Sequence, residues 1–118
     1  MRYLKKFNEA AIDLDERNQI AELAKESMVE LLDRNFEIFI VGHQLQIRNI
    51  KTFKWDDVKD SVIPFMEILS NEYRIQPQFS CIYSGRHDVE LSSILNDEVS
   101  GFNGSLKLNA IAININEL

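Results

Sequence analysis

Residues 53–69, FKWDDVKDSVIPFMEIL, constrain the fold of this chain more than any other segment. Their apolar side chains recur at the spacing of one helix face. Asp56 and Asp57 fall in the first turn, where the positive end of the helix dipole stabilises carboxylates. We therefore predict a helix that begins near Trp55. Its buried stripe is expected to contain Val58, Val62, Phe65, Met66, Leu69 and Tyr73.

Pro64 interrupts this helical pattern. Proline lacks an amide hydrogen and its ring clashes with the preceding turn of a helix. We expect a kink near Asp60, and the alternative is a new helix that starts with Ser61 as its cap.

A second helix is predicted over residues 14–34. Asp13 stands three residues before Glu16, which is a capping pattern, and Asp15 is the competing cap. Asn35 tolerates the left-handed conformation that often ends a helix. The apolar residues that recur at helical spacing are Ile20, Leu23, Ala24, Met28, Leu31 and Leu32.

The segment after this helix predicts a β-hairpin. Residues 36–41 are rich in aromatic and β-branched side chains, and residues 44–48 alternate polar with apolar. Gly42 and His43 lie between them, and glycine at the first position of a two-residue loop suits a type II′ turn.

The C-terminal part of the chain is predicted to be mainly strand. We expect a strand over residues 78–84 and a turn over 85–88, whereas residues 89–99 fit either a short strand or one helical turn. In residues 106–116 the apolar positions change parity near Asn109, so we expect a bulge at Asn109 and Ala110, or burial on both faces. This strand should lie in the sheet centre or at a subunit contact, because a long uncharged edge strand invites aggregation.

These elements follow the order α-β-β-α-β-(β/α)-β. They predict one α+β domain over residues 1–118, with two helices on one face of a mainly antiparallel sheet. Residues 1–12 are expected to be flexible or to form an N-terminal arm.

Composition places the chain among soluble globular proteins. Hydrophobic residues make up 45% and charged residues 27% of the 118 residues. No apolar run approaches the roughly 20 residues of a membrane span, and no secretory signal is recognisable. Cys81 is the single cysteine, which suits a reducing compartment. We therefore expect a cytoplasmic protein.

The net charge of −6 argues against direct nucleic-acid binding, because phosphate backbones are bound by lysine and arginine. The same charge is compatible with a basic protein partner, or with solubility alone.

Motifs for catalysis are missing from the sequence. His43, His87, Cys81 and Asp88 do not follow any metal-ligand spacing, and we interpret them as turn, loop and core residues. The serines lack a nucleophile elbow, and neither a P-loop nor a dinucleotide fingerprint occurs. We predict a protein that is not an enzyme and that uses no metal or other cofactor.

Carboxylates form two stripes at helical spacing. Glu22, Glu26, Glu30 and Asp33 follow one face of the first predicted helix, and Asp56, Asp60 and Glu67 follow the second. These stripes could present a negative surface to a basic partner, but a solvated helix face is the commoner explanation of such a pattern. Trp55, next to Phe53, could anchor an interface or pack its helix onto the sheet.

Four segments resemble a group of small proteins encoded by tailed bacteriophages. They are MRYLKKFNE at the start, LLDRNFEI at residues 31–38, FKWDDVKDSVIPFMEILSNEY at residues 53–73, and ILNDEV at residues 94–99. Lys54 departs from the better helix cap expected before the tryptophan. The resemblance implies a protein made in an infected bacterium, where small acidic proteins often disable host machinery such as CRISPR effectors.

Two functional hypotheses follow from these observations. The first is a non-enzymatic inhibitor that binds a host protein, an antiviral defence effector for example, through Glu22, Glu26, Glu30, Asp33, Asp56, Asp60 and Trp55, with a homodimer through the last strand as one possibility. The second is a protein that binds a small ligand or nucleotide, and sequesters or degrades a signal, for which Arg48, Arg74, Arg86 and His87 are the candidate cations. A phage structural or assembly role is a further alternative.

Overall fold

The structure is a computed structural model that describes residues 13–82, 84–96 and 107–118. The predicted N-terminal arm lies outside the described residues. The elements in chain order are α1 (Leu14–Ser27), α2 (Val29–Asp33), β1 (Glu37–Val41), β2 (Gln44–Lys54), α3 (Trp55–Ser70), β3 (Tyr73–Cys81), β4 (Gly85–Asp88), α4 (Leu91–Leu95) and β5 (Lys107–Glu117). The predicted α+β class is confirmed, although the described residues form four helices where two were expected.

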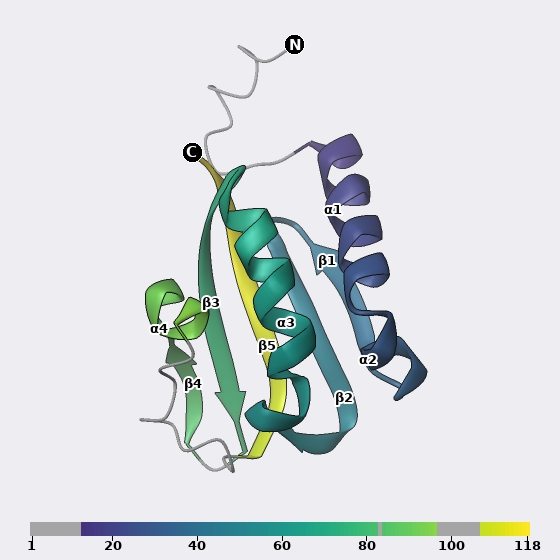
Figure 1. The fold of residues 1–118 in the computed structure, drawn as a ribbon, viewed down its shortest axis with the longest axis vertical. Coiled ribbons are helices and arrows are strands. Elements are labelled where there is room, and N and C mark those ends of the chain that lie inside the picture. Colours follow the sequence, from purple (N-terminus) through teal and green to yellow (C-terminus); the bar gives the residue numbers. More distant parts are fainter. Residues whose placement is uncertain (1–12, 83, 97–106) are drawn as a thin grey trace.

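The five strands form one antiparallel sheet in the order β1-β2-β5-β3-β4 (Figure 1). The predicted central position of the last strand is confirmed. The predicted bulge is also present, because Ser80 pairs with Ala110 whereas the next residue, Cys81, pairs with Leu108. Asn109 is therefore the extra residue of the bulge. Because of it, Leu108 on one side and Ile111 and Ile113 on the other are buried on the same face of the sheet.

The helices pack against one face of this sheet and against one another. α1 contacts β1, α3 contacts β2 and β3, and α4 contacts β3 and α3. Their apolar faces and the facing strand residues form one continuous core, in which the largest fully buried side chains include Phe65, Phe79, Met28, Leu31, Leu45, Ile47 and Ile111. In the part of the chain that the structure describes, none of the helices has both the length and the apolarity to cross a membrane.

The first predicted helix is divided into two. Asp13 caps α1, since its Oδ1 accepts a hydrogen bond of 2.8 Å from the amide of Glu16, as the capping pattern predicts. Met28 leaves the helical conformation between α1 and α2 while its side chain stays buried. Asn35 adopts a φ of 68° after α2, so the predicted left-handed residue is confirmed.

α3 begins at Trp55, as predicted. The backbone N–H of Lys54 donates to Asp57 Oδ2 at 3.3 Å, so a carboxylate of the first turn compensates for the poor capping residue. The helix continues through Pro64 to Ser70, and a restart at Ser61 is wrong. Pro64 is exposed, so the carbonyl of Asp60, which receives no hydrogen bond from proline, lies on the solvent side of the helix.

Two features of β3 differ from the prediction. Tyr73 is the first residue of β3 and does not extend the buried stripe of α3, so the strand starts before residue 78. Pro77 lies inside this strand. Its carbonyl accepts a hydrogen bond of 3.1 Å from Val89 N, so the backbone of Pro77 faces the β4 side of the strand. The β3–β4 pairing has ended at Gln78 and Asp88, so the N–H that proline lacks is not needed there.

The remaining local predictions have mixed outcomes. Val41 pairs with Gln44 across a two-residue turn in which only Gly42 has a positive φ, of 63°, as a type II′ turn requires. Gly85–Asp88 is strand β4 and not a turn, because it pairs with the end of β3. The helical alternative for residues 89–99 is confirmed by α4, and residues 97–99 lie outside the described part.

Candidate functional site

The face of the sheet opposite the helices is covered by no described helix. Cross-strand partners share a face, so the row Glu37, Arg48, Ala110, Ser80 and Arg86 runs across all five strands on this side. The next row is Phe39, Gln46, Ala112, Gln78 and Asp88, followed by Val41, Gln44, Asn114 and Gln76. We call this set of residues the open face.

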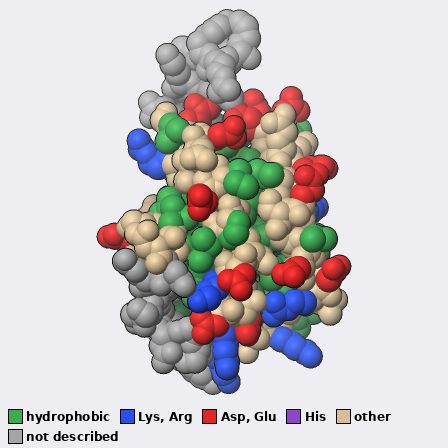
Figure 2. All heavy atoms as spheres, viewed as in Figure 1, with side chains coloured by type: hydrophobic (Ala, Val, Ile, Leu, Met, Phe, Trp, Pro, Cys, Tyr) green, Lys and Arg blue, Asp and Glu red, His purple; other side chains and the backbone are tan. Residues whose placement is uncertain are grey.

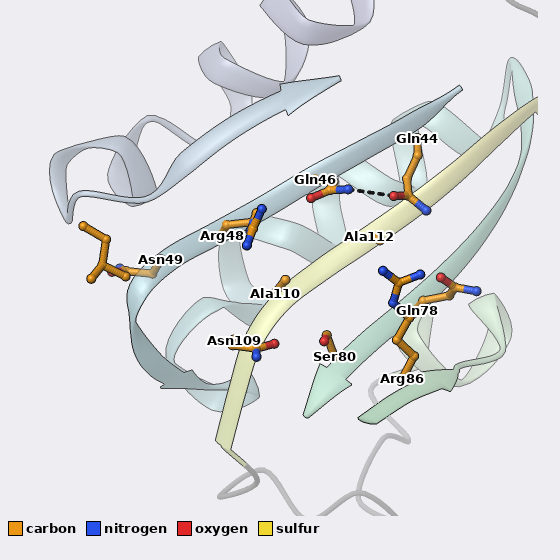
Figure 3. Close-up of a pocket in the computed structure, with 11 residues that line it drawn as sticks. Gln44, Gln46, Arg48, Asn49, Gln78, Ser80, Arg86, Asn109, Ala110 and Ala112 are labelled. Carbon is orange, nitrogen blue, oxygen red and sulfur yellow. Dashed lines mark hydrogen bonds between the residues drawn. The ribbon is translucent and has the colours of Figure 1, made fainter. Parts of the chain in front are cut away.

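The middle of the open face is hollowed into a depression of about 430 Å³. Ala110 and Ala112 of the central strand β5 form its floor, and longer side chains rise on both sides from β2, β3 and β4 (Figure 3). Its other lining residues are Gln44, Gln46, Arg48, Asn49, Ile50, Gln78, Ser80, Arg86 and Asn109. Among the described residues of the lining there is no carboxylate and no aromatic ring, although the chain as a whole carries a net charge of −6.

A ladder of amide side chains orders one wall of the depression. Gln46 Nε2 donates to Gln44 Oε1 at 2.7 Å (Figure 3), and Gln44 Nε2 donates in turn to Asn114 Oδ1 at 2.9 Å. On the opposite wall Gln78 Nε2 donates to Asp88 Oδ1 at 2.8 Å. Each amide has further donor or acceptor positions beyond these bonds, so both walls can hydrogen-bond to a bound molecule.

Two guanidinium groups lie on opposite sides of the depression (Figure 3). Arg48 belongs to β2 and Arg86 to β4, with β5 and β3 between them. Neither arginine forms an ion pair with another described residue. Glu37 is the β1 partner of Arg48, and Asp88 lies on the Arg86 strand, but neither acid lines the depression.

An irregular segment of β2 forms the rim beside Arg48. Arg48 pairs with Ala110 and Phe53 pairs with Leu108, so four residues of β2 stand opposite the single residue Asn109 of β5. Asn49 Oδ1 accepts from Lys51 N at 3.0 Å and supports this turn of the backbone. Ile50 follows Asn49, lines the depression and is 96% exposed. Bulges commonly redirect side chains beside functional sites, and this one places an apolar side chain at a polar rim.

The acidic stripes lie on the helix side, away from the depression. Glu22, Glu26, Glu30 and Asp33 are exposed on α1 and α2, and Asp56 and Asp60 are exposed on α3. Ser61 Oγ donates to Glu30 Oε2 at 3.4 Å, so α2 and α3 adjoin beside Glu30. Asp56 pairs with Lys59 at 3.7 Å. Figure 2 shows acidic side chains distributed over this side among apolar and basic ones.

Trp55 is buried, at 2% exposure, and packs against Phe79 with ring centroids 4.9 Å apart. Trp55 therefore packs α3 onto the sheet, as one of the two interpretations of the sequence expected. The other interpretation, an anchor for an interface on the surface, is wrong. Phe53 is buried too, in contact with Phe36.

Three of the four cations singled out in the sequence share the open face. Arg48 and Arg86 line the depression, and Arg74 lies on the same side of β3 as Gln76 and Gln78. His87 pairs with Phe79 and therefore lies on the helix side. The polar residues between these cations were missed, although the alternation of residues 74–80 and 110–116 already contains the signal.

The described lining residues of the depression supply groups that can bind a molecule. Of the described residues that line it, none is a histidine, cysteine or carboxylate that could act as a base for Ser80. Among the described residues no group of three or more His, Cys, Asp or Glu side chains is arranged to hold a metal ion. Arginines, amides and a small floor can hold an oxygen-rich group through charge-assisted and neutral hydrogen bonds.

Comparison with protein-family models, with curated proteins and with solved structures finds no match to this chain.

Proposed function

We propose that this chain is a non-enzymatic binding protein that docks a partner protein on its open face. The observation that carries the proposal is the depression between Arg48 and Arg86, whose lining offers hydrogen bonds and positive charge on an acidic chain. The expected class of partner, a protein of an infected bacterial host, is retained. The proposed contact surface moves from the acidic helices to the sheet.

The dimensions of the open face suit a protein partner. Neighbouring strands lie about 4.8 Å apart, so the sheet is about 19 Å wide between its outer strands. The nine residues of β3 extend the face by roughly 27 Å in the other direction. The product is roughly 500 Å² before side chains are counted, the same order as the ~800 Å² that one partner buries in a standard interface.

The chemistry of the rim also suits a protein. Ile50 is an apolar side chain surrounded by polar groups, which is the arrangement of an interface anchor. Pockets for small molecules are usually concave and mostly apolar, whereas this depression is polar and open. A nucleotide would in addition require a stacking partner for its base, and none of the described residues that line the depression is aromatic.

The test fills the depression without changing the charge of the chain. Ala112→Trp places a large ring on the floor between Gln46 and Gln78, on a half-buried strand position that tolerates aromatic residues. The matched control, Gln19→Trp, introduces the same ring on the exposed surface of α1 and also leaves the charge unchanged. Thermal melting must first show that both variants fold.

Tagged wild type and both variants are then incubated with lysate of the bacterial host, and captured proteins are quantified by mass spectrometry. We expect one host protein that is captured by wild type and by Gln19→Trp, and whose capture by Ala112→Trp is reduced at least about 10-fold. The purified protein should reproduce this order in calorimetry. Equal capture by Ala112→Trp, or no capture by wild type, would contradict the proposal.

A further inference from the structure

We infer that the segment docked in the depression is an extended, acidic stretch of the partner that carries two carboxylates on either side of the floor. This inference rests on the proposed function and adds the chemistry of the partner. Three observations support it: the separation of the two arginines, the small and amide side chains between them, and the position of the described helices on the other side of the sheet, away from any phosphate held here.

The spacing of Arg48 and Arg86 favours two charges over one. Their strands are separated by three inter-strand steps, about 14 Å at about 4.8 Å per step. An extended peptide rises about 3.3 Å per residue, so carboxylates four residues apart are about 13 Å apart. A single compact anion would require both side chains to leave their walls and meet over the floor, whereas Figure 3 shows the guanidinium groups apart.

The groups between the arginines suit the backbone of a peptide. Ala110 and Ala112 let a main chain approach the sheet closely, because a methyl group is the largest obstacle on the floor. Gln46 and Gln78 stand on opposite sides of Ala112 in one row of the sheet. Their amides provide both donors and acceptors, which match the alternating C=O and N–H groups of an extended chain.

A phosphate ligand lacks its usual partners here. Phosphates are commonly bound by backbone N–H groups at helix N-termini, and the described helices pack on the other side of the sheet. Arginine forms bidentate pairs with carboxylates and with phosphates alike, so the separation of the two arginines, and not their chemistry, disfavours a single phosphate. The two acids that flank the depression, Glu37 and Asp88, lie near its ends and leave the centre positive.

The inference has an unusual consequence for salt dependence. An acidic partner is repelled at long range by the net charge of −6 and attracted at short range by the two arginines. Salt screens both effects, so affinity should change little between about 50 and about 300 mM salt. A basic partner on the acidic stripes would lose affinity steadily over the same range.

The test uses isotope-labelled protein and a capped peptide in which three glutamates alternate with glycines, about 13 Å between the outer glutamates when extended. We expect chemical-shift changes at the amides of Ala110, Ala112, Ser80 and Arg86, with a dissociation constant of about 1 mM. The same peptide with glutamine in place of glutamate, and inorganic phosphate, should bind at least about 10-fold more weakly.

The matched variants remove the same charge from the two sides of the sheet. The double variant Arg48→Gln/Arg86→Gln should bind the glutamate peptide about 10-fold more weakly than wild type. The double variant Lys25→Gln/Lys59→Gln, with its changes on α1 and α3, should bind it as tightly as wild type. Equal binding of both double variants, equal binding of phosphate, or no shift on the open face would overturn the inference. If one of these negative results is found while Ala112→Trp still loses capture of the host protein, the docking surface is correct and only its acidic occupant is wrong.

Discussion

The two faces of the same sheet differ more than any two elements of this protein. Along β5, Ile111, Ile113 and Ile115 are fully buried against the helices, whereas Ala110 and Ala112, which alternate with them, form the floor of the depression on the open face. The helix side depends on tight apolar packing. The depression on the open face is lined mainly by amides, arginines and small residues that add little to the core. One strand therefore supplies stability through one set of alternate residues and a binding surface through the other.

The largest expected effect comes from two neighbouring residues of β3 that point to opposite faces. Phe79→Ala removes a fully buried ring that packs on Trp55, and should lower the free energy of unfolding by about 3–5 kcal/mol. Ser80→Ala, on the open face, should change it by less than about 0.5 kcal/mol. Urea denaturation of both variants measures the difference, and similar losses would mean that the open face is also structural.

Deletion of Asn109 should have an intermediate effect, because it removes the residue that keeps both halves of β5 in phase. Without the bulge, the half of β5 that contains Leu108 shifts by one position and this side chain turns toward the open face. We expect a loss of about 2–3 kcal/mol from exposing one leucine. Asn109→Ala keeps the extra residue and serves as the control. A deletion that unfolds at the same urea concentration as this control would show that the bulge does not set the register.

The smallest effect on stability is expected on the acidic helices. Changing Glu22, Glu26 and Glu30 together to Gln removes repulsion between like charges one turn apart, worth a few tenths of a kcal/mol per pair, and exposes nothing new. Thermal melting should therefore show a slight stabilisation, and capture of the partner should be unchanged. If this variant no longer captured the partner, the binding site would lie on the helix side and not on the open face.

Local sequence signals predicted much of the fold. The Asp13 cap, the left-handed Asn35, the Gly42 turn and the parity change at Asn109 each depend on a few neighbouring residues, and each is present in the structure. The central position of the last strand followed from the low charge of residues 106–116, because such a strand is stable only with neighbours on both sides.

Features that depend on distant contacts were not predicted. Tyr73 continues the helical spacing of α3, but pairing with Glu117 draws it into β3. The depression combines residues from four strands, including the irregular segment of β2 at its rim, and no single segment contains its pattern. The charge stripes on the helices were conspicuous because they are local, whereas the rows of the open face appear only once the strand register is known.

The position of β5 between β2 and β3 has a consequence for how the chain folds. Gln44 and Asn114 are 70 residues apart in sequence, yet their side chains hydrogen-bond across neighbouring strands. The β1–β2 hairpin and the β3–β4 pair can each form early from local contacts, but they become one sheet only when β5 inserts between them. Because closing such long loops is slow, we expect the rate-limiting step of folding to be this insertion, and the depression to be the last part of the protein to form.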